Sequence, residues 1–276
     1  MNPVQKALWY VEIHSRDPLN LEQIADACHT SPYHLTRAFS AVFGRPLMRY
    51  LRQRRLSDAA SQLAEGAADI LTLAMEAGYA SHEAFSRAFK EEFGCTPEAV
   101  RAQGHTRNLS LTEAFVMTSS PAPTLAPPRI EMLNPMLLAG IVERYDCNSP
   151  AGIPNQWQRF LPYFNNISAA VSRDAYGVVY NVDSEGFFDY LTGVEISAQS
   201  SIPFGLVQLP LPAQKYAVFS HAGHVAEIRT VIAAIWSEGL AAAGLEPNQG
   251  PTLEKYGPNF NPATGLGGFE IWIAVA

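Results

Sequence analysis

Two segments of the chain, fifty residues apart, place hydrogen-bonding side chains near the start of a predicted helix. Residues 31–44 read SPYHLTRAFSAVFG and residues 81–94 read SHEAFSRAFKEEFG, with apolar residues recurring at helical spacing. The polar face of each helix carries the candidates: Tyr33, Thr36 and Arg37 in the first segment, and His82, Glu83 and Arg87 in the second. An Arg can donate two hydrogen bonds to a guanine, and a Glu can accept one from a cytosine amino group. These residue types suit the reading of base edges. The alternatives are a phosphate contact or an intrahelical ion pair for each Arg, and simple solvent exposure for Glu83.

A second set of candidates is a pair of glutamates on predicted strands. Two strand-like runs contain Gly-Val-Glu-Ile and Gly-Phe-Glu-Ile, whose carboxylates are Glu195 and Glu270. Because side chains alternate along a strand, Glu270 should share a face with Gly268 and Trp272, and Glu195 with Gly193. A glycine two residues before a carboxylate leaves room for a bulky group, so both glutamates could line one groove if two halves pack about a pseudo-twofold axis. The alternative is an ordinary strand Glu that faces solvent or forms an ion pair.

The first set of candidates is positioned by helices that form an internal repeat. A short helical run and a tight turn precede each segment: LEQIADAC and HTS in the first copy, ILTLAMEA and GYA in the second. Asn20 and Gln23 resemble a capping box at the start of the first run. Helix, short turn, helix is the helix-turn-helix pattern, so residues 1–107 are predicted to form an all-α domain that contains it twice.

A long helix is predicted from Pro46 to about Glu65, between the two copies, where it would fix their relative placement. A basic run lies in and just before this helix: Arg45, Arg49, Arg52, Arg54 and Arg55. We interpret the run partly as a clamp for phosphates and partly as a solvated helix face.

The first hundred residues resemble the AraC/XylS family of regulators. The resemblance rests on the Arg-x-Phe in each second helix, on Gly94-Cys95-Thr96-Pro97 and on the following Arg101. It implies sequence-specific binding of double-stranded DNA, with base or backbone contacts from the polar residues of both second helices. The alternative is a helical domain that binds another protein, because helical hairpins also occur in other contexts.

Charge divides the chain at the same place. Residues 1–107 carry 12 basic and 12 acidic residues, whereas residues 108–276 carry 7 and 14, so the net charge of −7 lies wholly in the second part. Residues 108–128 are predicted to be a linker, because they contain the run TSSPAPTLAPP. Residues 129–276 then form the second domain.

The second domain is predicted to be α+β, built from two units of strand, helix, strand and strand. In the first unit the strands lie near 136–146, 175–182 and 187–197, with a helix near 153–171. In the second unit the strands lie near 214–221, 252–257 and 267–275, with a helix near 224–242.

This domain resembles the GyrI-like effector-binding domain, which is found fused to AraC-type and MerR-type DNA-binding domains. The resemblance rests on the architecture, on the ending Gly-Phe-Glu-Ile-Trp-Ile and on Leu-Glu-Lys-Tyr at 253–256. It implies a site that holds a lipophilic cation or neutral compound between an acidic residue and aromatic walls. The candidates are Glu270 as the best-matched acid, Glu195 as a second, and the aromatic residues Trp157, Tyr256 and Trp272. A packing role in the core is the alternative for Trp157.

The sequence therefore predicts a ligand-responsive transcription regulator rather than an enzyme. It contains neither Gly-x-Ser-x-Gly nor His-Glu-x-x-His, its three cysteines fit no metal or redox spacing, and we expect no cofactor, metal or catalytic residue. The expected partners are DNA and a small effector, with RNA polymerase a further candidate, and the expected location is the cytoplasm without membrane contact. The alternatives are a second domain that acts as a hydrolase-like enzyme or as a protein-binding module.

Overall fold

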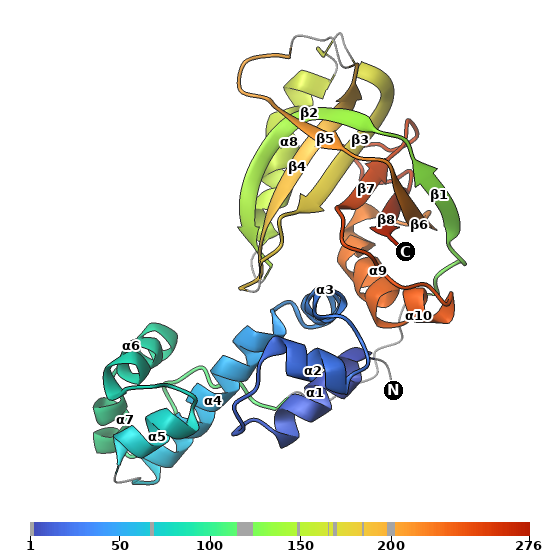
Figure 1. Cartoon of the computed structure of the whole chain (residues 1–276). Coiled ribbons are helices and arrows are strands. Elements are labelled where there is room, and N and C mark those ends of the chain that lie inside the picture. The colour runs from blue at the N-terminus through green and yellow to red at the C-terminus, as the bar shows by residue number, and fades with distance from the viewer. Residues whose placement is uncertain are drawn as a thin grey trace. The chain divides into compact units, whose positions relative to one another are not determined.

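A computed structural model describes residues 3–66, 69–114, 124–147, 150–164, 166–167, 170–183, 185–197 and 202–276. The chain forms two compact units, one of residues 1–35 and 46–119 and the other of residues 36–45 and 120–276 (Figure 1). The expected class, a helical region followed by a region of strands and helices, is confirmed. Residues 115–123 of the predicted linker lie outside the described residues.

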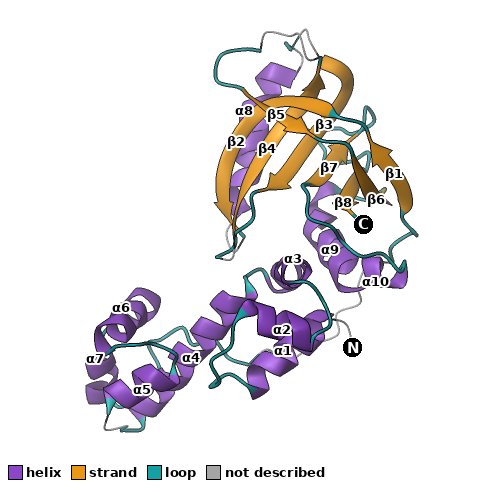
Figure 2. Ribbon diagram, in the orientation of Figure 1, coloured by secondary structure: helices purple, strands orange, loops and turns teal. Residues whose placement is uncertain are grey.

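The N-terminal region consists of helices connected by turns and short loops (Figure 2). They are α1 (Pro3–Ile13), α2 (Leu21–Ala27), α3 (Pro32–Phe43), α4 (Leu47–Ala64), α5 (Ile70–Glu76), α6 (His82–Phe93) and α7 (Pro97–Gln103). The pairs α2–α3 and α5–α6 are the two predicted helix-turn-helix units, and α4 is the predicted long helix between them. No helix in the described part of the chain has the length and apolar character needed to span a membrane.

Caps fix the ends of several of these helices. Asn20 Oδ1 accepts a hydrogen bond from Gln23 N at 2.8 Å, and Gln23 Oε1 accepts one from Asn20 N at 3.0 Å, which completes the expected capping box. Ser81 Oγ accepts from Ala84 N at the start of α6, and Gly94, with φ of 73°, ends that helix in the left-handed region. Ser81 and Gly94 therefore define where α6 begins and ends.

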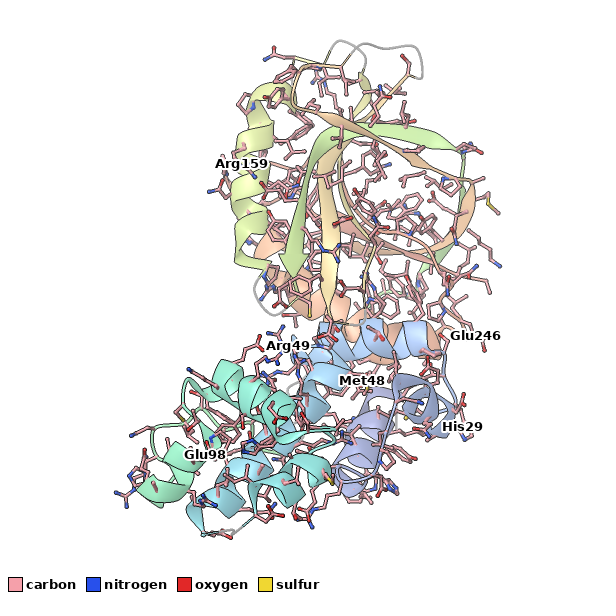
Figure 3. All side chains as sticks on the ribbon, turned by 60° about the vertical axis from the view of Figure 1, so that its left-hand side comes forward. His29, Met48, Arg49, Glu98, Arg159 and Glu246 are labelled. Atoms are coloured by element: carbon pink, nitrogen blue, oxygen red, sulfur yellow. The ribbon has the colours of Figure 1, made fainter. Side chains whose placement is uncertain are left out.

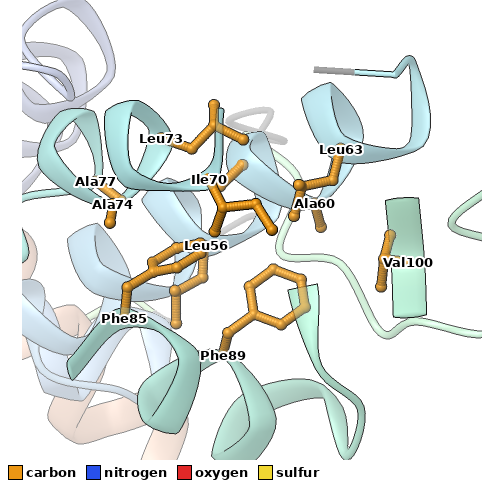
Figure 4. Close-up of a cluster of buried hydrophobic side chains, with 11 residues drawn as sticks. Leu56, Ala60, Leu63, Ile70, Leu73, Ala74, Ala77, Phe85, Phe89 and Val100 are labelled. Atoms are coloured by element: carbon orange, nitrogen blue, oxygen red, sulfur yellow. The ribbon is translucent and has the colours of Figure 1, made fainter. Parts of the chain in front are cut away.

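A cluster of buried apolar side chains joins α4, α5, α6 and α7 (Figure 4). Phe85 and Phe89 of α6 are fully buried in it, with ring centroids 5.5 Å apart. They pack in one cluster with Leu56 of α4 and Leu73 of α5. Because both rings lie on one side of α6, the other side of this helix must face solvent.

The start of the predicted linker is packed on this cluster. Leu109 and Leu111 contact it, Thr112 N donates to Ser57 Oγ at 2.9 Å, and Thr112 O accepts from Arg54 at 3.1 Å. Residues 109–112 therefore belong physically to the helical unit.

The second unit is an eight-stranded, curled antiparallel sheet with strand order β1-β6-β8-β7-β3-β4-β2-β5. The strands are β1 (Arg129–Leu133), β2 (Met136–Asp146), β3 (Ala170–Tyr180), β4 (Phe187–Ile196), β5 (Val207–Leu211), β6 (Gln214–His221), β7 (Thr252–Tyr256) and β8 (Phe269–Ala274). The helical segments are α8 (Ile153–Phe164) and the run α9 (Ile228–Ala234), a π-helical turn (Ile235–Gly239) and α10 (Leu240–Ala242).

The six strands expected from the sequence are present, and two further strands were missed. β1 and β5 form the two edges of the sheet, where short, partly exposed strands give a weak alternation signal, and an edge also tolerates Pro210 within β5. The helix expected to reach residue 171 ends at Phe164, because Ala170 already pairs with Ile196 as part of β3.

The two faces of the sheet have different cores. The helix-covered face packs Phe160 of α8 against Val194 and Ile196, whereas Arg159 on the outer side of α8 points away and pairs with Glu143 at 2.5 Å (Figure 3). The opposite face has its own apolar cluster: Leu138, Tyr176, Val178, Leu191, Leu211, Tyr216, Val218, Leu253, Trp272 and Ala274. A polar residue on a strand can therefore be buried on either face.

Phe89→Ala should lower the free energy of unfolding of the helical unit by about 3–5 kcal/mol, because it leaves a cavity between four helices. Urea denaturation followed by circular dichroism would measure the loss. The exposed neighbour Lys90→Ala is the control and should change the free energy by less than about 0.5 kcal/mol. Similar losses in both variants would contradict the assignment of Phe89 to the core.

Candidate functional site

The solvent-facing side of α6 carries the residues expected from the sequence. Arg87 is exposed and makes no hydrogen bond or ion pair with any residue that the structure describes. His82 Nε2 lies 3.2 Å from Glu98 Oε1 of α7. The exposed Glu83 lies in the first turn, where hydrogen bonds from its own backbone N–H and from Ser81 lower its carboxyl pKa. Of these three side chains, only Arg87 has its whole hydrogen-bonding capacity available.

The matching residues of the first helix-turn-helix unit, Tyr33, Thr36 and Arg37, lie in the first two turns of α3. Leu35 and Phe39 of the same helix are fully buried, so helical geometry places the three on the other side of α3. Tyr33, Thr36 and Arg37 are each partly exposed, and their contact with DNA stays a prediction.

Part of the basic run of α4 has a structural role. Arg54 pairs with Glu12 of α1 at 3.3 Å and with Asp58 at 3.0 Å. Arg55 donates to the carbonyl oxygens of Ser15 at 2.6 Å and Asp17 at 2.5 Å. These two guanidinium groups hold α1 and the segment after it against α4, so they are not the solvated face that the sequence suggested.

A buried carboxylate lies on the helix-covered face of the sheet. Glu254 of β7 is 8% exposed, and its Oε2 accepts from Tyr190 Oη at 2.6 Å and from Tyr256 Oη at 3.0 Å. No cationic side chain pairs with it among the described residues. Burial raises the pKa of Glu254, while the two phenol donors act in the opposite direction.

Aromatic rings surround this carboxylate. Trp157 of α8 donates its indole N–H to Tyr190 Oη at 3.1 Å and meets the Tyr256 ring edge-on, with centroids 5.1 Å apart. The Tyr256 ring also contacts Phe260 at 4.7 Å and Phe269 at 6.4 Å. The site therefore combines one acidic group with the faces and edges of several rings, a combination that suits an apolar cation.

Gly177 of β3 makes room for this cluster. It pairs with Glu254 in the sheet, and a Cβ at position 177 would collide with Tyr190 Oη and lie 2.7 Å from Glu254 Oε2. A residue with a side chain at this place would push the Tyr190 hydroxyl away from the carboxylate.

The match to known families identifies the domain that holds this site. The model of the GyrI-like small molecule binding domain matches residues 126–276, more than half of the chain. The chain belongs to the GyrI-like family. A helix-turn-helix domain model matches residues 24–103, and the regulatory protein SoxS of Salmonella typhimurium is 37% identical over 98 residues, which is 36% of this chain and 92% of SoxS. The protein is thus an AraC-type DNA-binding regulator with a C-terminal GyrI-like small-molecule-binding domain.

Two relatives and one solved structure illustrate the range of similarity. The transcriptional regulator BrlR of Pseudomonas aeruginosa is 37% identical over 105 residues, which is 38% of this chain and 38% of BrlR. The transcriptional regulator Rob of Salmonella typhimurium is 23% identical over 270 residues, or 95% of this chain and 92% of Rob. The structure of SAV2435 bound to tetraphenylphosphonium is 17% identical, has a TM-score of 0.46, and covers 55% of this chain and 94% of SAV2435.

The five effector candidates from the sequence fall on two faces of the GyrI-like sheet. Trp157 and Tyr256 lie on the helix-covered face beside Glu254. Glu195, Glu270 and Trp272 lie on the opposite face, where Glu270 Oε1 pairs with Arg129 at 2.8 Å and Glu270 Oε2 accepts from Trp272 Nε1 at 2.9 Å.

Glu195 and Glu270, which the sequence suggested could line one groove, lie at different positions in their strands. Glu195 is the last residue but one of β4, whereas Glu270 is the second residue of β8, and two strands separate β4 from β8. Three strand spacings amount to roughly 14 Å, so the two carboxylates do not face each other across a small ligand.

The glycines that precede these glutamates do not open space for a ligand either. A Cβ on Gly268 would lie 2.7 Å from the carbonyl oxygen of His221, and one on Gly193 would collide with the carbonyl oxygen of Ala139. At both positions the lack of a side chain lets the backbone of a neighbouring segment come close.

Sequence reasoning missed Glu254 and Tyr190. Tyr256 was named and Glu254 was not, although strand alternation puts residues two apart on the same face. The signal was therefore present for Glu254. For Tyr190 there was none, because its hydroxyl reaches Glu254 across β3.

Glu254→Gln should flatten the pH dependence of stability. A carboxyl whose pKa is raised by folding stabilises the folded state at low pH, and this contribution is lost as the pH rises through the folded-state pKa. The wild type should thus lose more unfolding free energy than the variant between about pH 4 and about pH 8. Urea denaturation across this range measures it, with the exposed Glu246→Gln as the control. Parallel curves for wild type and Glu254→Gln would refute the burial argument.

Proposed function

We propose that this regulator reads operator DNA with the polar sides of α3 and α6, and that its GyrI-like domain binds a lipophilic cation or neutral compound at Glu254. On α6, Arg87 makes the base contact while His82 and Glu83 lie beside it. On α3, Tyr33, Thr36 and Arg37 take the equivalent places. Two recognition helices of one chain suit major-groove segments about one turn, ~34 Å, apart.

The observation that supports the effector site is the buried Glu254 carboxylate without a cationic partner. Removing a carboxylate from water is costly unless another charge or several donors replace the water. Two phenol hydroxyls offset part of that cost. A ligand cation would supply the missing charge, and the rings of Trp157 and Tyr256 would add about 0.5–2 kcal/mol each through cation–π contacts.

Glu270 is assigned a structural role in this proposal. Its charge is already balanced by Arg129, and Arg129 also donates to Ser220 Oγ at 2.9 Å and pairs with Glu131. These contacts connect β1, β6 and β8 at one edge of the sheet. A ligand would have to displace the guanidinium of Arg129 before it reached this carboxylate.

We also propose that the GyrI-like sheet arose from two similar units. Its strand order reads the same backwards when β1–β4 are exchanged with β5–β8, and each unit has a helical segment between its second and third strands. The boundaries proposed from the sequence, 1–107 and 129–276, are compatible with β1 starting at Arg129. The contacts of residues 109–112 favour a linker that starts after residue 114 rather than at 108.

The remaining assignments follow from this role. A regulator acts where the chromosome is, which is the cytoplasm in a bacterial cell, and RNA polymerase is the partner through which bound DNA would affect transcription. The fold of the GyrI-like domain gives no specific support to the alternative of a protein-binding module or a hydrolase, and the relatives compared above are named as transcriptional regulators.

Arg87→Ala should relax base preference at one or two positions of the operator, by about 1–3 kcal/mol for each lost pairing. Selection from randomised duplexes, followed by fluorescence anisotropy with single-base variants, would show it. Lys90→Ala, on the same helix and further from its N-terminus, is the control and should keep the preference. Uniform weakening across all sequences would instead identify a phosphate contact.

Glu254→Gln should weaken tetraphenylphosphonium binding by about 1–3 kcal/mol and leave the uncharged triphenylphosphine oxide nearly unchanged. A bound cation stabilises the ionised carboxylate and so opposes the burial that raises the pKa of Glu254, which couples cation binding to proton release. Calorimetry in buffers with different ionisation enthalpies measures both effects. Glu270→Gln is the matched control. A larger effect of Glu270→Gln than of Glu254→Gln would reverse the assignment.

A further inference from the structure

A cavity of about 220 Å³ lies on the face of the sheet opposite the Glu254 cluster. The turn between β1 and β2 covers one side of it with Leu133, Asn134 and Met136, among others. The sheet supplies the other side with Tyr176, Glu195, Leu253, Lys255 and Trp272. Leu253 and Lys255 alternate with Glu254 along β7. The same strand therefore lines the cavity on one face and the Glu254 cluster on the other, and the sheet separates the two.

The cationic groups at this cavity are already neutralised. Lys255 Nζ pairs with Asp174 Oδ2 at 3.0 Å and lies over the rings of Tyr176 and Trp272, at 5.9 and 5.8 Å from their centroids. Arg129, whose guanidinium is 5.8 Å from the Trp272 centroid, pairs with Glu131 and Glu270. Neither cation has a free charge to offer an anionic ligand.

Glu195 differs from the other acidic residues near this cavity. It is half-buried, it lines the cavity, and within the described residues it forms no ion pair. With Asp174, Glu131 and Glu270 it makes four acidic groups around two basic ones, so the local charge is negative. Burial raises the pKa of Tyr176, and the carboxylates of Asp174, Glu195 and Glu270 add to that effect, which agrees with a negative potential at its hydroxyl.

The walls are suited to the apolar part of a ligand. Leu133, Met136 and Leu253 are aliphatic or thioether side chains, and Trp272 adds an indole face. The volume is below the roughly 300–1,000 Å³ of pockets that hold drug-sized ligands. It therefore fits a compound with a single ring or a short chain.

We propose that this cavity is a second ligand site, which binds a small organic amine as its ammonium ion. Glu195 pairs with the ammonium group, and Trp272, Leu133 and Met136 enclose the apolar group. The site is separate from the effector site proposed at Glu254 and does not depend on it.

The test is calorimetry on the full chain with three probes of similar shape. They are 2-phenylethylamine, which is cationic, 2-phenylethanol, which is uncharged, and phenylacetate, which is anionic. The wild type should bind the amine, and Glu195→Gln should weaken it about tenfold or more, as expected for loss of a charged hydrogen-bond partner. Binding of the alcohol should change less than twofold.

Glu254→Gln is the matched control, because it removes a carboxylate from the other face of the same sheet. It should leave 2-phenylethylamine binding unchanged, and Glu195→Gln should leave tetraphenylphosphonium binding unchanged, so each site can fail independently. Equal amine binding by wild type and Glu195→Gln, no amine binding by the wild type, or tighter binding of phenylacetate would overturn the proposal. Loss of amine binding in Glu254→Gln alone would move the amine to the Glu254 site and overturn it as well.

Discussion

The burial of one carboxylate organises the GyrI-like domain. Among the described residues, the partners of Glu254 are the hydroxyls of Tyr190 and Tyr256, so both phenols must be held in place if the charge is to be tolerated. Gly177 keeps the space between Tyr190 and Glu254 free of a side chain. The position of α8 follows from the same requirement, because Trp157 donates to the hydroxyl of Tyr190.

Gln156 shows how α8 is fixed. This fully buried side chain donates to the carbonyl oxygens of Ile141 at 2.8 Å and Tyr190 at 2.9 Å, and it accepts from Tyr145 Oη at 2.8 Å. A buried amide with its hydrogen bonds satisfied is costly to move, since each unpaired group would lose its partner without gaining water. The neighbouring Trp157 is therefore positioned by a polar anchor in addition to apolar packing.

In the helical region, too, some side chains hold the helices in place while others remain available for DNA. Phe85 and Phe89 fix the orientation of α6, and this leaves Arg87 exposed. Arg54 and Arg55 of α4 bond to α1 and the residues after it, so they stabilise the scaffold. Arg87 on α6 thus differs in role from Arg54 and Arg55 on α4, because its side of the helix is not covered.

The sequence by itself determined the elements and their repeats. The helix-turn-helix pairs, the Asn20 capping box and six of the strands follow from periodicity and caps, which depend on residues close together in the chain. The sequence also showed that the second domain is acidic and that Arg87 lies on the polar face of its helix. Only the tertiary structure decided the partners of the carboxylates. Glu270 meets Arg129 across a sheet edge, Glu254 meets Tyr190 across an intervening strand, and Glu195 is left at a cavity. Strand alternation gives the face of a residue, but strand order and register give its neighbours, and residues 64 positions apart such as Tyr190 and Glu254 meet only when the sheet is formed.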